Sequence, residues 1–85
     1  MHRFRIFRES NPNLAWLEIE EGNINIESGI RFMYAFLDYK NTPIERSVFV
    51  INGNDFADIG KSGKDTRIAI LELLLESTNS IIVQE

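Results

Sequence analysis

Cysteine is missing from this chain, and its absence excludes several kinds of site at once. The 85 residues can form no disulfide, no thiolate metal site and no cysteine nucleophile. Because small secreted domains usually depend on disulfides, the composition favours a cytoplasmic protein. No apolar run approaches the ~20 residues of a membrane-spanning helix. Arg3 and Arg5 also interrupt the N-terminus where a signal sequence would be apolar. We therefore expect a soluble protein without a membrane contact.

Histidine is almost as scarce, because the chain has only His2, at the end where order is usually poorest. A Ser-His-Asp triad would have to use that residue as its base. A metal site would have to consist of carboxylates, and Asp55, Asp58 and Asp65 do not follow the spacing of a calcium-binding loop. We predict that the protein is not an enzyme and has no catalytic residue, cofactor or metal.

One short motif, Gly60-Lys61-Ser62, occupies the place of a phosphate-binding loop between a predicted strand and a predicted helix. The first glycine of such a loop would fall at position 55, where the carboxylate of Asp55 would repel phosphate. Gly63 then interrupts the helix whose N-terminus would hold the phosphate. The segment is expected to be a solvated connector. Lys61 and Lys64 remain candidates for a looser contact with phosphate or an acidic patch.

The composition is typical of one globular domain covering residues 1–85, with 44% hydrophobic and 11% aromatic residues. Alternating apolar and polar residues predict strands over 3–8, 14–20 and 24–26, with turns at 10–13 and 21–23. Residues 45–52 are apolar on both faces, which is typical of a strand in the middle of a sheet. Residues 81–83 are expected to form a short final strand.

Residues 29–40 fit two kinds of element. Aromatic and aliphatic residues alternate from Ile30 to Phe36, which favours a strand. Ile30, Met33, Tyr34 and Leu37 also match helical spacing, and Ser28 could cap such a helix. The aromatic content makes the strand our prediction. The sequence then predicts an α+β fold, with a mainly antiparallel sheet of four to five strands packed against one C-terminal helix (65–77) and a short final strand.

The predicted helix over 65–77, capped by Asp65 or Thr66, has more apolar surface than one core contact needs. At 100° per residue, six isoleucines and leucines spread over about 220° of its circumference, whereas a helix lying on one sheet needs roughly 100°. The final strand or a helical turn over 56–59 could cover the extra flank. Alternatively, Leu73 and Leu75 lie on a flank that contacts a second protein.

Charge is unevenly distributed in a chain whose formal net charge is −4. Residues 1–8 contain three arginines and no acid, whereas residues 9–29 contain five glutamates and no base. The two segments form separate electrostatic poles if they lie apart, and they neutralise each other if the first two strands pair. Glu18 and Glu20 share a strand face about 7 Å apart, and we interpret them as solvated rather than as a catalytic pair.

The leading hypothesis for function is a small non-enzymatic interaction domain: an inhibitor, adaptor or regulatory subunit. Its contact would be an apolar patch with an acidic rim, and its partner an unidentified protein or a second copy of the chain. The residues proposed for this contact are Glu18, Glu20, Glu21, Glu27, Leu73 and Leu75.

The alternative hypothesis is a module that binds single-stranded nucleic acid. Arginines are interleaved with aromatic residues, and such sheet faces hold single strands by base stacking and phosphate contacts. The acidic net charge opposes this function, because electrostatics supplies most nonspecific affinity. The residues proposed for it are Arg3, Arg5, Phe7, Arg8, Trp16, Arg31, Lys61 and Lys64.

Overall fold

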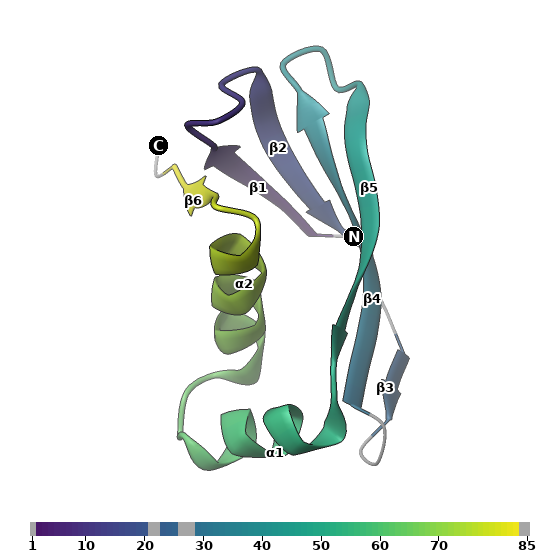
Figure 1. Cartoon of the computed structure of the whole chain (residues 1–85), viewed down its shortest axis with the longest axis vertical. Coiled ribbons are helices and arrows are strands. Elements are labelled where there is room, and N and C mark those ends of the chain that lie inside the picture. The colour runs from purple at the N-terminus through teal and green to yellow at the C-terminus, as the bar shows by residue number, and fades with distance from the viewer. Residues whose placement is uncertain (1, 21–22, 26–28, 84–85) are drawn as a thin grey trace.

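Two helices pack against a six-stranded sheet in the computed structural model, which describes residues 2–20, 23–25 and 29–83 (Figure 1). The elements in chain order are β1 (His2–Phe7), β2 (Leu14–Ile19), β3 (Asn23–Asn25), β4 (Gly29–Asp38), β5 (Pro43–Ile51), α1 (Gly53–Lys61), α2 (Thr66–Ser77) and β6 (Ile81–Ile82). The predicted α+β class, antiparallel sheet, C-terminal helix and short final strand are confirmed. Residue 26 and residues 21–22, which fall in a predicted strand and turn, lie outside the described residues.

The long strand β4 organises the sheet. One of its edges pairs with β5, and its other edge pairs with β3 near the start and with β2 near the end. β1 and β6 continue the sheet beyond β2, and every pairing is antiparallel. The prediction of a strand for residues 29–40 is therefore correct over Gly29–Asp38. Gly29 has φ +95°, and a Cβ there would collide with the Ile51 carbonyl, so the approach of β5 requires glycine.

Alternation along the strands divides the sheet into an inner face, toward α2, and an outer face. A cluster of buried residues fills the space between the inner face and α2; it comprises Ile6, Leu14, Leu17, Ile30, Phe32, Phe36, Ile51, Leu74 and Leu75. Residues directly opposite each other on neighbouring strands share a face. By this register, Arg3, Glu18, Ala35 and Arg46 form one row across the outer face. Arg5, Trp16 and Leu37 form a second row.

The helix α2 begins where it was predicted to begin. The Asp65 side chain caps it by accepting hydrogen bonds from the Arg67 and Ile68 backbone N–H groups at 2.9 and 3.4 Å. Both α1 and β6 contact α2, so the segments expected to cover its extra flank do so in part. Ile68 and Leu73 nevertheless stay exposed. Neither described helix is long and apolar enough to cross a membrane.

The segment after β5 is a longer helix than the single turn predicted over 56–59. The Asn52 side chain caps α1 by accepting a hydrogen bond from the Asp55 backbone N–H at 2.9 Å. Phe56 and Ile59, three residues apart, pack against the core. This spacing leaves Asp55 and Asp58 exposed on another side of α1. The helix crosses the lower end of the molecule in Figure 1 and connects β5 to α2.

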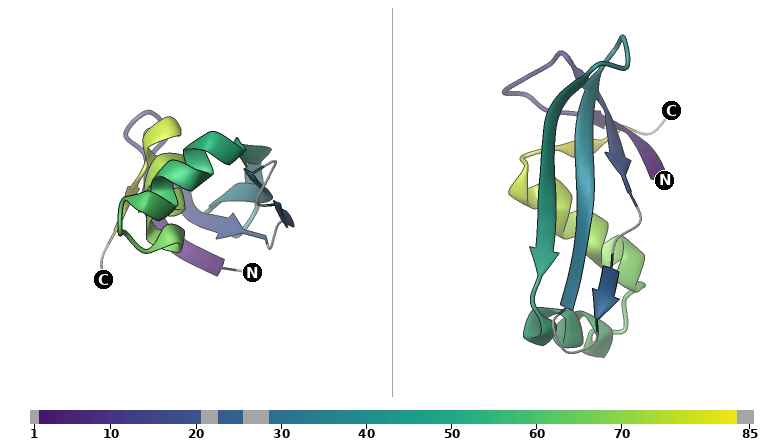
Figure 2. Two further views of the ribbon diagram at one scale, coloured as in Figure 1. Left: turned by 90° about the horizontal axis from the view of Figure 1, so that it is seen from below. Right: turned by 90° about the vertical axis from the view of Figure 1, so that its right-hand side faces the viewer.

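The prediction that residues 45–52 form a central strand is wrong. In the described part of the chain, β5 pairs only with β4 and forms an edge of the sheet (Figure 2, right). Phe49 and Ile51 point to the core, as a half-buried strand requires. Val48 and Val50 point to the outer face, where they stay exposed. The apolar residues on the second face therefore indicate exposed apolar surface and not a second covered face.

Candidate functional site

The free edge of β5 presents backbone groups that no other described strand uses. The Met33 carbonyl accepts a hydrogen bond from the Glu20 N–H at 2.9 Å, so the backbone groups of Met33 point toward β2 and away from β5. Met33 lies opposite Val48 in the β4–β5 ladder. Because the backbone groups of Met33 point away from β5, Met33 and Val48 form a non-hydrogen-bonded pair. The N–H and C=O groups of Val48 therefore point outward from the sheet, and by alternation so do those of Arg46 and Val50.

An apolar groove lies beside this edge, between the end of β5 and the two helices. Its volume is about 510 Å³, and its lining residues are Phe49, Val50, Ile51, Asp55, Asp58, Ile59, Leu73 and Ser77. Val50 is 61% exposed and Leu73 is 39% exposed. A free strand edge and an open apolar groove are therefore adjacent, and both are accessible to another molecule.

Two charged side chains line the groove in the described part of the chain. Both are acidic: Asp55 and Asp58. One Asp55 carboxylate oxygen accepts a hydrogen bond from the Asn52 side-chain amide at 3.0 Å. Neither aspartate forms an ion pair with another described residue. Three residues apart on α1, the two carboxylates lie on the same side of the helix. They give the α1 end of the groove a negative charge.

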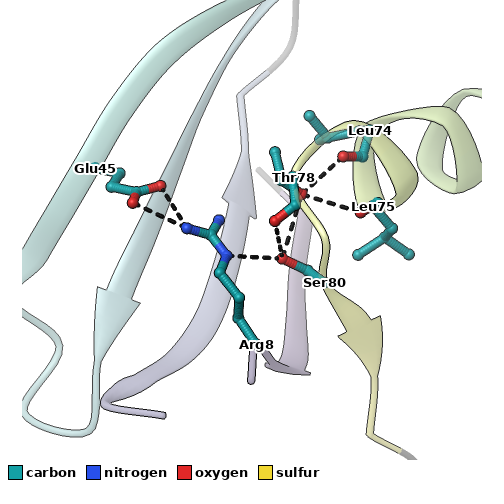
Figure 3. A network of polar contacts seen from close by, with 6 residues as sticks. All are labelled: Arg8, Glu45, Leu74, Leu75, Thr78 and Ser80. Atoms are coloured by element: carbon teal, nitrogen blue, oxygen red, sulfur yellow. Dashed lines mark hydrogen bonds and ion pairs between the residues drawn. The ribbon is translucent and has the colours of Figure 1, made fainter. Parts of the chain in front are cut away.

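An internal ion pair holds the beginning of β5 in place (Figure 3). The Arg8 Nη1 atom donates hydrogen bonds to Glu45 Oε1 and Oε2 at 2.9 and 3.0 Å. The Arg8 Nε atom donates to Ser80 Oγ at 3.3 Å, and the guanidinium lies 4.5 Å from the centre of the Phe36 ring. Arg8 is only 8% exposed. It therefore links β5 to the segment after α2 and is not available to nucleic acid, contrary to its place among the candidates.

The outer face brings together two arginines and two aromatic rings. Arg3 lies 4.2 Å and Arg5 5.1 Å from the centre of the Trp16 ring, and Arg5 lies 5.0 Å from the centre of the Tyr39 ring. Arg3 also forms a 3.9 Å ion pair with Glu18 and a hydrogen bond with Asn41. The Arg3–Glu18 pair shows that pairing of the first two strands partly neutralises the two charged segments.

The other residues proposed from the sequence are scattered. Leu73 lines the groove, but Leu75 is only 9% exposed and belongs to the core, so its place in an exposed patch was wrong. Of the proposed acidic rim, Glu18 lies on the outer face and Glu20 is exposed at the end of β2, whereas Glu21 and Glu27 lie outside the described residues.

The remaining residues proposed for nucleic-acid binding do not lie on one surface. Arg31 is on the outer face opposite Val50, and Phe7 is exposed beside β6. Lys61 ends α1, and Lys64 forms a 3.4 Å ion pair with Glu72 on α2. The two lysines therefore lie at the helical end of the chain and not with Arg3 and Arg5.

Sequence reasoning missed four residues of the β5 region: Val48, Val50, Asp55 and Asp58. The sequence pattern that included the two valines was a strand apolar on both faces. We interpreted this pattern as a strand in the middle of the sheet. The two aspartates were considered as calcium ligands, and Asp55 also as a residue that argues against a phosphate-binding loop, but neither was considered as part of a protein contact. In the described ranges, no three histidine, aspartate or glutamate side chains gather to hold a metal ion. Comparison of the chain with protein-family models, curated proteins and solved structures found no match.

Proposed function

We propose that this protein is a non-enzymatic interaction domain that binds an extended segment of another protein as an additional strand on β5. The observation that carries the proposal is the free edge at Arg46, Val48 and Val50 next to the apolar groove. In strand addition, main-chain hydrogen bonds supply affinity and pockets for alternate side chains supply specificity. The β5 edge offers both components in one place.

The distribution of protective residues along β5 indicates where the added strand would bind. Proteins usually protect a free edge with proline, charged residues or a bulge. The first half of β5 has Pro43, Glu45 and Arg46, and the ladder is irregular opposite Phe36 and Leu37. Residues 47–51 have neither charge nor proline, and they end beside the groove. The unprotected half of the edge is therefore the half that adjoins the apolar groove, which supports strand addition there.

The test uses a proline on the free edge. The Val48 N–H points away from β4, so Val48→Pro removes an outward donor without removing a hydrogen bond of the β4–β5 ladder. Val48→Thr is the matched control, because it keeps both the N–H and the β-branched shape. The tagged domain is used to capture its partner from native lysate, and the partner is then purified and titrated with each variant by calorimetry.

We expect Val48→Thr to bind within about threefold of the unmodified domain, and Val48→Pro to bind at least about tenfold more weakly, as loss of one or two backbone hydrogen bonds predicts. Circular dichroism at the titration temperature must show that both variants are folded. Unchanged affinity in folded Val48→Pro would exclude strand addition on β5.

A second candidate function is binding of single-stranded nucleic acid on the outer face. The observation that favours it is a face with more basic than acidic side chains on an acidic chain, since Arg3, Arg5, Arg31 and Arg46 share this face with Glu18 and Glu20. Arginines beside aromatic rings are common in sites that hold single strands. The two guanidiniums that already stack on Trp16 count against it, because an incoming base would have to displace one of them.

This second function is tested by titrating the domain with an oligothymidine at low and at moderate salt, while following Trp16 fluorescence. If the function is correct, affinity falls steeply with salt, and Arg5→Gln weakens binding at least about fivefold. Arg67→Gln on the exposed side of α2 is the control, with the same change in charge. If Trp16 fluorescence does not change at low salt, this function is excluded.

A further inference from the structure

The groove beside β5 is polarised along the direction of the strand. Side chains of an added strand that face inward would lie in turn opposite Ser47, Phe49 and Ile51. Phe49 and Leu73 make the middle of the groove apolar, whereas Asp55 and Asp58 approach it from α1 at the end near Ile51. The three inward positions of the added strand therefore meet different environments.

We infer that the bound segment runs antiparallel to β5, with an apolar side chain opposite Phe49 and a lysine or arginine opposite Ile51, near its N-terminal end. This inference rests on the proposed function. Two carboxylates line that end of the groove, and neither is paired with a described cation, so a basic side chain is complementary there. Every pairing in the described sheet is antiparallel, and antiparallel ladders are slightly more stable per residue.

A second copy of the chain fits this groove poorly. In a symmetric antiparallel pair centred on Val48, residues 46 and 50 lie opposite each other, and so do residues 45 and 51. Glu45 of the second copy would then lie opposite Ile51, beside Asp55 and Asp58. That carboxylate already pairs with Arg8 of its own copy, so the second copy places no free positive charge opposite the two aspartates. The charge of the groove therefore favours a different polypeptide with a basic residue at that position.

The probe is a capped seven-residue peptide with the sequence Thr-Lys-Thr-Val-Thr-Val-Thr. Its lysine and two valines face the groove when it pairs antiparallel with β5, and the lysine lies opposite Ile51. The reversed peptide, Thr-Val-Thr-Val-Thr-Lys-Thr, has the same composition but places the lysine at the other end. A third peptide replaces the lysine with glutamate. Binding is measured by NMR titration of the isotope-labelled domain, following the amide signals of residues 46–51.

Backbone pairing is tested separately from side-chain preference. In the antiparallel arrangement, the N–H groups of the second and third threonines point to Val50 and Val48, whereas the N–H of the first valine points away from β5. N-methylation of those two threonines should abolish binding, and N-methylation of that valine should weaken it far less. The two modified peptides together show whether the peptide forms hydrogen bonds with the predicted edge.

We expect the first peptide to bind at least about tenfold more tightly than the reversed and glutamate peptides, with the largest shifts at Val48 and Val50. Asp58→Asn should reduce this preference to about threefold or less. Glu9→Gln, the same change in charge at the distant turn after β1, should leave the preference intact. The Asp58 variant thus separates a local contact from the effect of net charge.

Three results would overturn the inference. If all three peptides bind the β5 edge equally, the charge preference is wrong, although the proposed function stands. If no peptide shifts any β5 amide, the stated chemistry of the occupant is wrong, and the proposed function is judged by the Val48→Pro titration alone. If light scattering shows a dimer that Val48→Pro dissociates, the occupant is a second copy of the chain.

Discussion

Removing the exposed partner of the Arg8–Glu45 pair should destabilise the protein more than removing the buried one. The Arg8 side chain is 10% exposed and the Glu45 side chain is 46% exposed. Glu45→Ala leaves a buried guanidinium that has lost two of its acceptors. Arg8→Met instead leaves a carboxylate that water can reach, and it keeps a long apolar side chain over Phe36.

The magnitudes follow from this asymmetry. Breaking a fully buried pair from one side costs about 3–5 kcal/mol, and an exposed pair contributes about 0–1 kcal/mol. Because Glu45 is half exposed, we expect Glu45→Ala to lower the free energy of unfolding by about 2 kcal/mol. We expect Arg8→Met to lower it by about 1 kcal/mol or less, because the Glu45 carboxylate that remains is 46% exposed and can be hydrated, as in an exposed pair.

The assay is urea unfolding, followed by Trp16 fluorescence and by far-UV circular dichroism. A domain of this size has a free energy of unfolding of roughly 4–13 kcal/mol, so a change of 2 kcal/mol is measurable. Ser47→Ala, on the same strand and face, is the control for alanine in β5. The double variant should cost less than the sum of the single ones. The reasoning is refuted if Arg8→Met costs more than Glu45→Ala, or if Glu45→Ala matches Ser47→Ala.

Three further predictions concern stability and the groove. Gly29→Ala should lower the free energy of unfolding by several kcal/mol, because φ is positive at this residue and the new Cβ meets the β5 backbone. Gly60→Ala, in open space within α1, should raise it by about 0.5–1 kcal/mol. Thermal melts compare the two variants. Leu75→Lys should unfold the domain, because it buries a charge. Leu73→Lys should stay folded and lose peptide binding. If folded Leu73→Lys binds the peptide as tightly as the unmodified domain, Leu73 is not part of the binding surface. Asn52→Ala should cost about 1 kcal/mol in urea unfolding, and Asn52→Asp, which keeps the capping oxygen, should cost less.

Local patterns predicted most of the elements correctly. Alternation identified β1 and β2, and Asp65, one of the two caps that the sequence offered, marks the start of α2. The aromatic content of residues 29–40 correctly favoured a strand over a helix. These features depend on residues that are close together in the sequence, because side-chain periodicity and helix capping involve only residues of the same strand or helix. The candidate site was predicted much less well, because Leu73 alone among the proposed contact residues that the structure describes lines the groove.

The sequence by itself determined the fold class, the periodicity of each long strand and a helix with more apolar surface than one core contact covers. Only the tertiary structure decided that β5 is an edge, that Leu75 is buried while Leu73 is exposed, and that Arg8 is used internally by Glu45. It also placed Asp55 and Asp58 beside the end of β5. The physical reason is that hydrophobicity shows which side chains are stabilised by leaving water, but not which segment covers them. That choice depends on strand order and helix placement, which arise from contacts between residues far apart in the chain.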